Sequence, residues 1–473
     1  MSSIKIKNGI YYELNGWKYV SVKGSPEERG YAYGFLMMKD FKKVKEMLEF
    51  NSMNYYAQPW SFFIDASVKH LKPNIIKNFP ELYKEMCAIA KGCNAAAKDD
   101  KFTSEDEIIA WNNYFTLFDS WYSHANLGSS ISKEGGGASD KCSAFIATGS
   151  YTKDGKIVVA HNSFSEFLDG QYENVILDIH PDKGHRILMQ TSPCWIWSGT
   201  DFFVTGKGII GTETTIGGFN KFENNNTISC RIRKAMQYGN TLKEYEEILL
   251  DGNSGDYANS WLFGDTSTNE IMRIELGLKY HNTEIKRDGY FVGFNATYDP
   301  KIRNLECVNS GFDDIRRHQG SRRVRLTDLM EQNKGKIDVK MAQNIIADHY
   351  DVYLNKQNKC SRTVCSHYEL DAREFMSDPT RPKPFQPRGA VDGCVADTAL
   401  IKKMQFLGRW GSSCGTPFIV KDFCNKHRQW DYLRPYLHDR PSQPWTLFKV
   451  YDHTHSESIK KKRRYITSKT KKK

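Results

Sequence analysis

The sequence lacks long apolar runs and any divider between domains. No stretch of about eighteen consecutive apolar residues occurs in the 473 residues, so no transmembrane helix is expected. Residues 1–15 alternate polar and apolar side chains and lack the continuous apolar core of a secretion signal, so they predict a strand. No Pro-rich or Ser-rich linker and no internal repeat is present. We therefore expect one large body, although the length alone allows two or three domains.

Cysteine spacing predicts neither a disulfide framework nor a metal site. The chain has eleven cysteines, an odd number, and no recognisable signal for export. Two pairs are close in sequence, Cys87 with Cys93 and Cys360 with Cys365, but neither has the spacing of a metal-binding knuckle. We therefore expect mostly buried, reduced thiols, no metal and no cofactor.

Acidic residues are outnumbered, and the net charge is +11, but the excess lies at one end. Residues 459–473 hold nine Lys or Arg and no acid, so the rest of the chain is close to neutral. This distribution favours a targeting signal or a flexible attachment segment at the end of the chain over a basic groove that binds nucleic-acid phosphates. The run Lys460 to Arg464 resembles a nuclear localisation signal, and a solvated, disordered terminus is the plainer interpretation. Without a signal peptide, we expect a cytoplasmic or virion-like protein, with weak nucleic-acid or anionic-surface contact through this tail.

The first 125 residues predict a hairpin followed by helices. Asn15-Gly16 between two apolar strands, residues 10–14 and 17–22, is a strong type I′ turn signal. Helical patterns with capping residues then cover residues 26–50, 61–70, 80–98 and 104–121. Residues 126–141 are rich in Gly and Ser and have no apolar period, which predicts an exposed loop. That loop is either a tolerated surface insertion or a maturation linker.

From Cys142 onward the pattern becomes mostly strands. Strands are expected near residues 142–148, 156–162, 172–180, 186–190, 208–215, 259–264, 271–276 and 290–294, and helices near 229–238, 241–250, 322–331 and 339–349. Strands joined by hairpins with helices between them indicate an α+β fold, an antiparallel sheet covered by helices. We expect residues 142–458 to form the main body, packed with residues 1–125 as one domain, and residues 459–473 to be a disordered tail.

The first two of these strands predict a specific side-chain neighbourhood. If Gly149 pairs with Lys156 across the turn, Ala144 lies opposite His161, and His161 lies diagonally across from Cys142. Such diagonal neighbours are about 7–8 Å apart. A one-residue slip of register would send His161 to the other face of the sheet.

Cys142 is the first residue of a strand and follows a Gly-rich loop. If the bond between Lys141 and Cys142 breaks, Cys142 gains an α-amine with a pKa of about 8, which can act as general base for its own thiol. His161 could then orient the amine or bind substrate, or serve only as a structural histidine. From this pattern alone, a small buried strand residue is the simpler interpretation of Cys142.

A family resemblance changes that interpretation. Cys142-Ser143-Ala144-Phe145, with the following 154–156 and 159–162 segments, resembles the nucleophile hairpin of the phospholipase B-like proteins. These are similar to the wider group of cysteine N-terminal nucleophile hydrolases, which includes penicillin acyltransferase and the conjugated bile acid hydrolases. Other segments resemble the family in the same order along the chain: residues 24–30 with Gly34, residues 213–216, residues 257–261 with Asp265, and residues 389–392 with 417–418.

The resemblance implies a fold, a maturation step and a set of site residues. The fold is a four-layer αββα sandwich of two antiparallel sheets between helical layers. The proenzyme is cut between Lys141 and Cys142, and the two fragments stay together. Asn259 corresponds to the oxyanion-stabilising asparagine, whose amide can contribute roughly 3 kcal/mol of transition-state stabilisation. Further candidates are His161 and Arg323 in the catalytic site, and Thr214 and Asn295 in substrate binding.

The resemblance predicts a hydrolase that cleaves a linear amide or acyl ester, of a small molecule or a lipid, through an acyl-enzyme on Cys142. An acyltransferase on the same machinery is an alternative, because acceptor choice leaves no mark in the residue pattern. A third interpretation is a non-catalytic packaged or structural protein with a nucleic-acid-binding tail. The basic tail, the shorter length and the lack of a secretory signal depart from the animal members, so lysosomal residence, cofactors and partners are not carried over.

Overall fold

Two large β-sheets form the centre of the computed structural model, which describes residues 3–125, 142–373 and 383–453. The first sheet has ten strands in the order β1 (Ser3–Ile6), β2 (Gly9–Leu14), β3 (Trp17–Gly24), β6 (Val175–Pro181), β7 (Ile187–Thr191), β8 (Phe202–Thr205), β9 (Ile209–Thr215), β10 (Asn259–Asp265), β11 (Glu270–Leu276) and β12 (His281–Lys286). The second has the order β13 (Gly289–Gly293), β4 (Cys142–Thr148), β5 (Val158–Glu166), β17 (Asp392–Asp397), β18 (Gln405–Trp410) and β19 (Thr446–Lys449), with β16 (Arg388–Ala390) also paired to β5. A separate short pair is formed by β14 (Tyr350–Asp351) and β15 (Lys356–Gln357).

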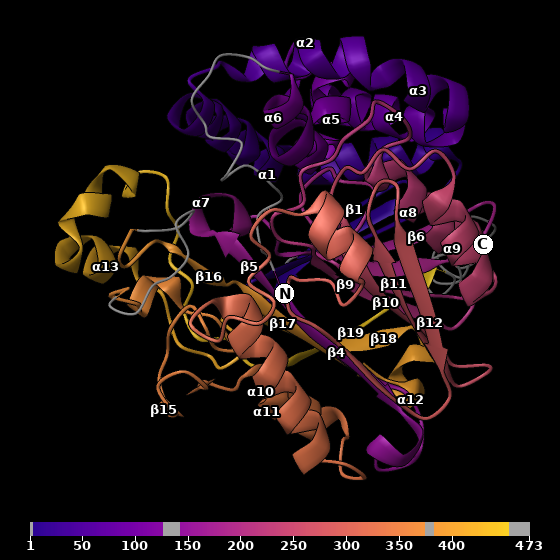
Figure 1. The fold of residues 1–473 in the computed structure, drawn as a ribbon. Helices are drawn as coiled ribbons and strands as arrows, with labels where there is room; N and C mark the ends of the chain where they lie inside the picture. The colour runs from indigo at the N-terminus through magenta and orange to yellow at the C-terminus, as the bar shows by residue number, and fades with distance from the viewer. Residues whose placement is uncertain (1–2, 126–141, 374–382, 454–473) are drawn as a thin grey trace, which may run out of the picture.

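Helices lie on the outer face of each sheet (Figure 1). The ten-stranded sheet is covered by α1 (Pro26–Tyr56), α2 (Trp60–His70), α3 (Lys72–Asn78), α4 (Pro80–Ala97), α5 (Glu105–Asn112), the π-helical turn η1 (Thr116–Trp121), α6 (Tyr122–His124), α8 (Ile228–Tyr238) and α9 (Leu242–Leu250). The seven-stranded sheet is covered by α10 (His318–Gln332) and α11 (Val339–Ile346). The short helices α7 (Phe167–Gly170), α12 (Thr398–Ile401) and α13 (Val420–Lys426) lie in connections.

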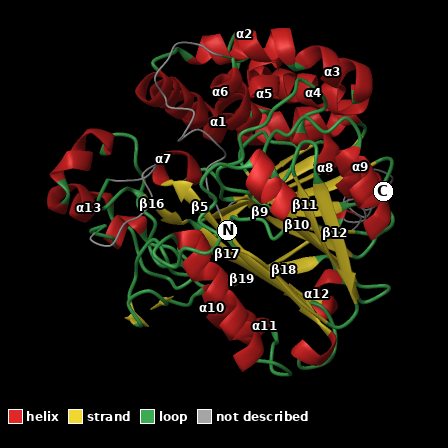
Figure 2. Ribbon diagram, in the orientation of Figure 1, coloured by secondary structure: helices red, strands yellow, loops and turns green. Residues whose placement is uncertain are grey.

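Helices and sheets are stacked in four layers (Figure 2). Alternation along the strands buries apolar side chains between each pair of neighbouring layers. Phe263 packs with the helices of the first 125 residues, whereas its neighbour Leu262 packs between the sheets. On the second sheet, Ile146 packs between the sheets, and Phe145 packs against α10 and α11. Successive strand residues face opposite sides, so each sheet is buried on both faces. The predicted α+β fold, a four-layer αββα sandwich, is confirmed.

One strand pair departs from the expected antiparallel arrangement. The hairpin of β2 and β3 forms as predicted, with positive φ at both Asn15 (51°) and Gly16 (81°). Its second strand then pairs in parallel with β6, from Lys18 opposite Val175 to Gly24 opposite Pro181. A parallel pair needs a long crossover, and the helical block with β4 and β5 supplies it. Strands from before and after the 126–141 segment therefore share one sheet.

The differences from the expected elements have simple causes. Strands β8 and β12 were not predicted. Strand β8 has only four residues, too few to show an alternation of polar and apolar side chains, and β12 is an edge strand of mostly polar, partly exposed residues. The helix expected over 104–121 ends at Asn112 and resumes as a π-helical turn. Among the residues that the structure describes, none of the helices combines the length and apolar character needed to span a bilayer. The predicted cleavage residue Lys141 and the basic tail lie outside the described residues.

Candidate active site around Cys142

Cys142 begins β4 at the inner face of the second sheet and is buried, with 1% of its surface exposed. The predicted register is confirmed: Ala144 lies opposite His161, and Cys142 lies opposite Ser163. The Cys142 sulfur, a ring nitrogen of His161 and a carboxylate oxygen of Asp201 all lie within 4.8 Å of one another. The sulfur is 3.9 Å from Oδ2 of Asp201, which it contacts as a weak thiol donor.

The main chain of Cys142 is held by two buried side chains. Its N–H donates to Oδ1 of Asn295 at 3.2 Å, and its carbonyl accepts a hydrogen bond from the guanidinium of Arg322. The same guanidinium donates to Ser143 Oγ at 3.0 Å and to Asn295 Oδ1 at 2.7 Å. Asn295 is itself fixed by a 2.8 Å bond from its Nδ2 to the carbonyl of Thr215. Arg322 thus ties β4 to Asn295, the side chain that holds the nitrogen of Cys142.

The structure does not bring the predicted Arg323 into this group. Its guanidinium donates to the carbonyl of Phe312 at 3.0 Å and pairs with Asp313 at 3.2 Å. Consecutive helical residues point about 100° apart, so only one of the two arginines at this end of α10 can face Cys142. The helix end predicted from the sequence does approach Cys142, but through Arg322 and not through Arg323.

Two carboxylates and a tyrosine surround the thiol. The hydroxyl oxygen of Tyr257 lies 3.0 Å from Asp201 Oδ2 and 3.0 Å from Glu213 Oε1, so its single proton can be donated to either carboxylate. On its other side, the Tyr257 ring stacks on Phe115 at 4.8 Å between centroids. Burial raises the pKa of the Cys142 thiol well above its usual value, and the nearby charges of Glu213 and Asp201 raise it further. The thiol in this environment is therefore protonated.

His161 cannot serve this site as a cation. Burial lowers its pKa to about 3, although the main chain of Glu213 partly opposes the shift. The neutral ring can accept or donate one hydrogen bond without adding charge.

Three residues around the thiol have left-handed backbone conformations. Asp201, Tyr257 and Asn295 have φ values of 68°, 49° and 64°. Asn and Asp tolerate this region, but it is unusual for a bulky residue such as Tyr. Strained backbone of this kind tends to gather at functional sites, where the surrounding structure holds it in place.

The other two predicted residues lie on β9 and β10. A Cβ added at Gly293 would lie 2.5 Å from Cγ2 of Thr214, and Gly293 pairs with Ala144. Thr214 therefore lies against β13, at the residue that pairs with Ala144, two positions along β4 from Cys142. Asn259 lies opposite Thr215, the residue whose carbonyl holds Asn295. Both polar atoms of the Asn259 amide are buried and have no hydrogen-bond partner within the described part of the chain. An unpaired buried amide costs free energy, so a site that receives a ligand is a natural place for it.

Asp392 supports the strand opposite Cys142. Its Oδ1 accepts the N–H of Ser163 at 2.9 Å, and its Oδ2 accepts from Nε2 of Gln190 at 2.7 Å. Burial raises the pKa of Asp392 to about 6, against the lowering effect of the Ser163 N–H. Arg322, Asp201, Tyr257 and Asp392 were not among the predicted site residues. Tyr257 and Asp392 lie within segments that carried the family resemblance, whereas Asp201 lies in an irregular loop with no sequence signal.

Comparisons with known proteins agree with the resemblance. The family model described as phospholipase B matches residues 36–445. Phospholipase B from Crotalus adamanteus is 25% identical over 248 residues, 47% of this chain and 42% of that protein. Putative phospholipase B-like 2 from Rattus norvegicus is 22% identical over 326 residues, 58% of this chain and 53% of that protein. The chain thus matches about half the length of these curated relatives.

Among solved structures, a variant of the conjugated bile acid hydrolase from Clostridium perfringens aligns with a TM-score of 0.36 and 11% identity, over 56% of this chain and 89% of that one. A likeness of this level supports no conclusion about the site. The family match is of a different kind, because it spans most of the chain, including the strand of Cys142, the Arg322 helix and the strand of Asp392. The chain belongs to the phospholipase B family.

Proposed function

We propose that this chain is a hydrolase that cuts its own peptide bond between Lys141 and Cys142 and then cleaves a linear amide or acyl ester through an acyl-enzyme on Cys142. The observation that carries the proposal is the set of side chains that contact Cys142. Its N–H donates a hydrogen bond to Asn295, and its carbonyl accepts one from Arg322. Its sulfur lies close to Asp201 and His161. Every buried main-chain N–H needs an acceptor, and here the acceptor is a side chain that could also hold the α-amine freed by the cut.

In the proposed maturation step, the Cys142 sulfur attacks the carbonyl carbon of Lys141. The thiol proton leaves toward Asp201, the nearest acceptor, at 3.9 Å from the sulfur. The C–N bond breaks, the nitrogen of Cys142 takes up a proton, and a thioester to Lys141 remains. Water hydrolyses this thioester and releases a carboxylate at residue 141 and a free thiol on Cys142. The new α-amine stays where the amide was, beside Asn295.

In turnover, the α-amine takes the thiol proton and the thiolate attacks the substrate carbonyl. The amine, held by Asn295, then gives the proton to the leaving amine or alcohol, and water hydrolyses the acyl-enzyme. Asn259 supplies an amide N–H for the oxyanion, in line with its unpaired polar atoms. Thr214 and neutral His161 line the space beside the sulfur. Phospholipid and amide substrates suit this chemistry equally, so both are assayed.

Intact-mass analysis of the purified chain tests the maturation step. We expect two fragments, residues 1–141 and 142–473, that elute together because β3 pairs with β6 across the cut. Cys142→Ala is expected to stay uncut, whereas Cys424→Ala, which changes a buried cysteine of α13, is expected to be cut like the wild type. Efficient cutting of Cys142→Ala would show that an outside protease is responsible.

Turnover of a fluorogenic acyl amide and of the matching ester tests the second step. The cut wild-type protein is expected to hydrolyse at least one of them, and Cys142→Ala neither. If fully cut protein hydrolyses no acyl substrate, the hydrolase proposal fails, and the structural-protein interpretation gains ground.

A further inference from the structure

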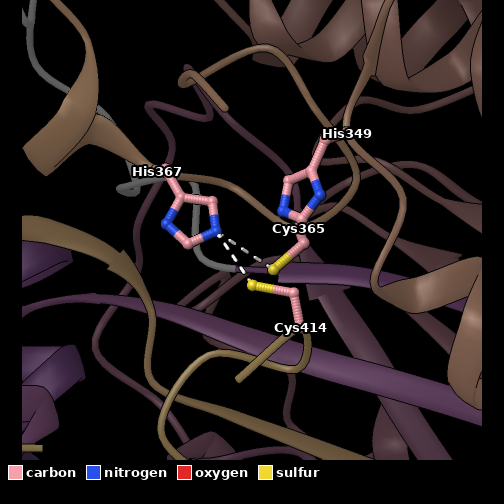
Figure 3. Close-up of side chains that lie close together, drawn as sticks. All are labelled: His349, Cys365, His367 and Cys414. Carbon is pink, nitrogen blue, oxygen red and sulfur yellow. Dashed lines mark hydrogen bonds between the residues drawn. The ribbon is translucent and has the colours of Figure 1, made fainter. Parts of the chain in front are cut away.

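Four side chains with metal-binding atoms converge at a second place, on three separate segments. His349 lies between α11 and β14, Cys365 and His367 lie in the irregular segment after β15, and Cys414 lies in the loop after β18. Their sulfur and ring nitrogen atoms all lie within 4.8 Å of one another. Figure 3 shows the two sulfurs beside one edge of the His367 ring, with the His349 ring next to them.

The distances fit a single tetrahedral ion. Nε2 of His367 lies 3.4 Å from the sulfur of Cys365 and 3.4 Å from the sulfur of Cys414. With zinc–sulfur bonds of about 2.3 Å and zinc–nitrogen bonds of about 2.0–2.1 Å, tetrahedral geometry places sulfur and nitrogen about 3.6 Å apart. The spacing found is close to that value.

A carboxylate orients the imidazole of His367. Nδ1 of His367 lies 2.7 Å from Oε1 of Glu369, which turns Nε2 toward the sulfurs. A carboxylate on the far nitrogen is the usual support of a metal-bound histidine. Nε2 of His349 is buried and has no hydrogen-bond partner within the described ranges. Cys365 and His367 are buried as well, with 0% and 1% of their surfaces exposed.

We propose that His349, Cys365, His367 and Cys414 bind one zinc-class divalent cation in a closed tetrahedral site. Two thiolates balance the charge of the cation, and four protein ligands leave no open position, so the role is structural. A thiol, an imidazole and a carboxylate in a row, as in Cys414, His367 and Glu369, can also form a nucleophile group. The second thiol and the second imidazole at the same point favour the cation.

The four-residue site is connected to β4, the strand of Cys142, through hydrogen bonds of Asn162. Nδ2 of Asn162 donates to the carbonyl of Val364, next to Cys365, at 3.3 Å and to Oγ of Ser413, next to Cys414, at 3.0 Å. Oδ1 of Asn162 in turn accepts the N–H of Ser143 at 3.2 Å, one residue after Cys142. A cation that fixes Cys365 to Cys414 therefore fixes two of the three acceptors of Asn162, the third being the carbonyl of Ile346 at 2.9 Å. The cation site then acts on Cys142 by position, not by chemistry.

The test is metal content of the full chain, which does not depend on turnover or on the cut before Cys142. The protein is stripped with a chelator under reducing conditions, titrated with Zn²⁺, dialysed and analysed for zinc by elemental mass spectrometry. We expect about one ion per chain in the wild type, in Cys142→Ala and in Cys424→Ser, and nearly none in Cys365→Ser. Retention in Cys142→Ala separates this site from the Cys142, His161 and Asp201 group, whose atoms are also close.

Titration of the wild type with Co²⁺ gives an answer even if Cys365→Ser does not fold. A four-coordinate thiolate site is expected to give intense visible absorption that Zn²⁺ abolishes, and His349→Ala, at the less buried edge, is expected to weaken Co²⁺ binding at least 10-fold. Three results overturn the proposal: no zinc retained by the wild type, equal zinc in Cys365→Ser, or a protein purified without reductant that is lighter by two hydrogen masses because Cys365 and Cys414 are joined.

Discussion

Replacing Arg322 by glutamine is expected to lower both the stability of the chain and the function of Cys142. The guanidinium, fully buried, donates to the carbonyl of Cys142, to Ser143 Oγ and to Asn295 Oδ1. Hydrogen bonds from a charged donor contribute about 1.5–3 kcal/mol each. A glutamine amide is shorter and cannot keep all three, so the loss of two predicts a fall of roughly 3–6 kcal/mol in the free energy of unfolding.

The adjacent Arg323 provides a matched control on the same helix. Its guanidinium is 26% exposed and pairs with Asp313, which is 84% exposed. Exposed ion pairs contribute up to about 1 kcal/mol, and Arg323 makes one charged hydrogen bond besides, to the carbonyl of Phe312. Arg323→Gln is therefore expected to cost less than Arg322→Gln, which loses two such bonds in a buried site. Arg322→Lys keeps the charge but loses the planar fork, and is expected to lie between the two glutamine variants.

Urea unfolding followed by tryptophan fluorescence gives the free energies, and intact mass gives the fraction cut before Cys142. In the cut protein, Arg322→Lys also loosens Cys142, so kcat/KM is expected to fall by roughly 10²-fold. If the two glutamine variants cost the same and are cut alike, the assignment of Arg322 to the nucleophile is refuted.

Three further predictions use the same assays. Asn259→Ala is expected to lower kcat by roughly 10²–10³-fold with little change in substrate binding, because an oxyanion donor acts mainly in the transition state, and Asn259→Asp to be at least as harmful; wild-type rates in Asn259→Ala would remove it from the mechanism. The raised pKa of Asp392, about 6 against an ordinary 3.8, means that its contribution to stability is fully present below pH 4 and is lost as the pH rises through 6. The loss is about 3 kcal/mol, so the free energy of unfolding should fall less between pH 4 and pH 7 in Asp392→Asn than in the wild type. An equal fall in the two proteins would contradict the raised pKa of Asp392. Truncation after Ser458 is expected to leave turnover of a model ester unchanged and to weaken binding to anionic vesicles or nucleic acid; a collapse of turnover would mean that the tail belongs to the fold.

Local patterns were enough to predict most of the elements and the register of the nucleophile hairpin. Asn15-Gly16 specifies a hairpin by its need for positive φ, and the Gly149–Lys156 turn sets Ala144 opposite His161. Both depend on residues that are close in sequence. The parallel pairing of β3 with β6 could not be predicted in this way, because no local signal specifies which distant strand forms the next neighbour.

The candidate site was only partly predictable for the same reason. Cys142, His161 and Asn295 do lie together, but the choice between Arg322 and Arg323 depends on the rotation of α10 about its axis, which an arginine-rich segment does not reveal. Asp201 reaches the thiol from a loop without periodicity. The four residues of the second cluster lie on three segments, so their spacing has no pattern that a sequence search could recognise.

If the chain is cut as proposed, the stacking of Phe115 on Tyr257 gives the residues before the cut a lasting part in the mature molecule. A propeptide that only assists folding can be discarded once the fold is made. Here the ring of Phe115 backs the tyrosine whose hydroxyl binds Asp201 and Glu213, so the discarded piece would take one wall of the nucleophile's surroundings with it. A protein that began at Cys142 would contain the proposed nucleophile but would lack Phe115, which packs on Tyr257 beside it. Under the proposed cut, the two pieces would act as subunits of a heterodimer that are encoded as one chain and so are made in equal amounts.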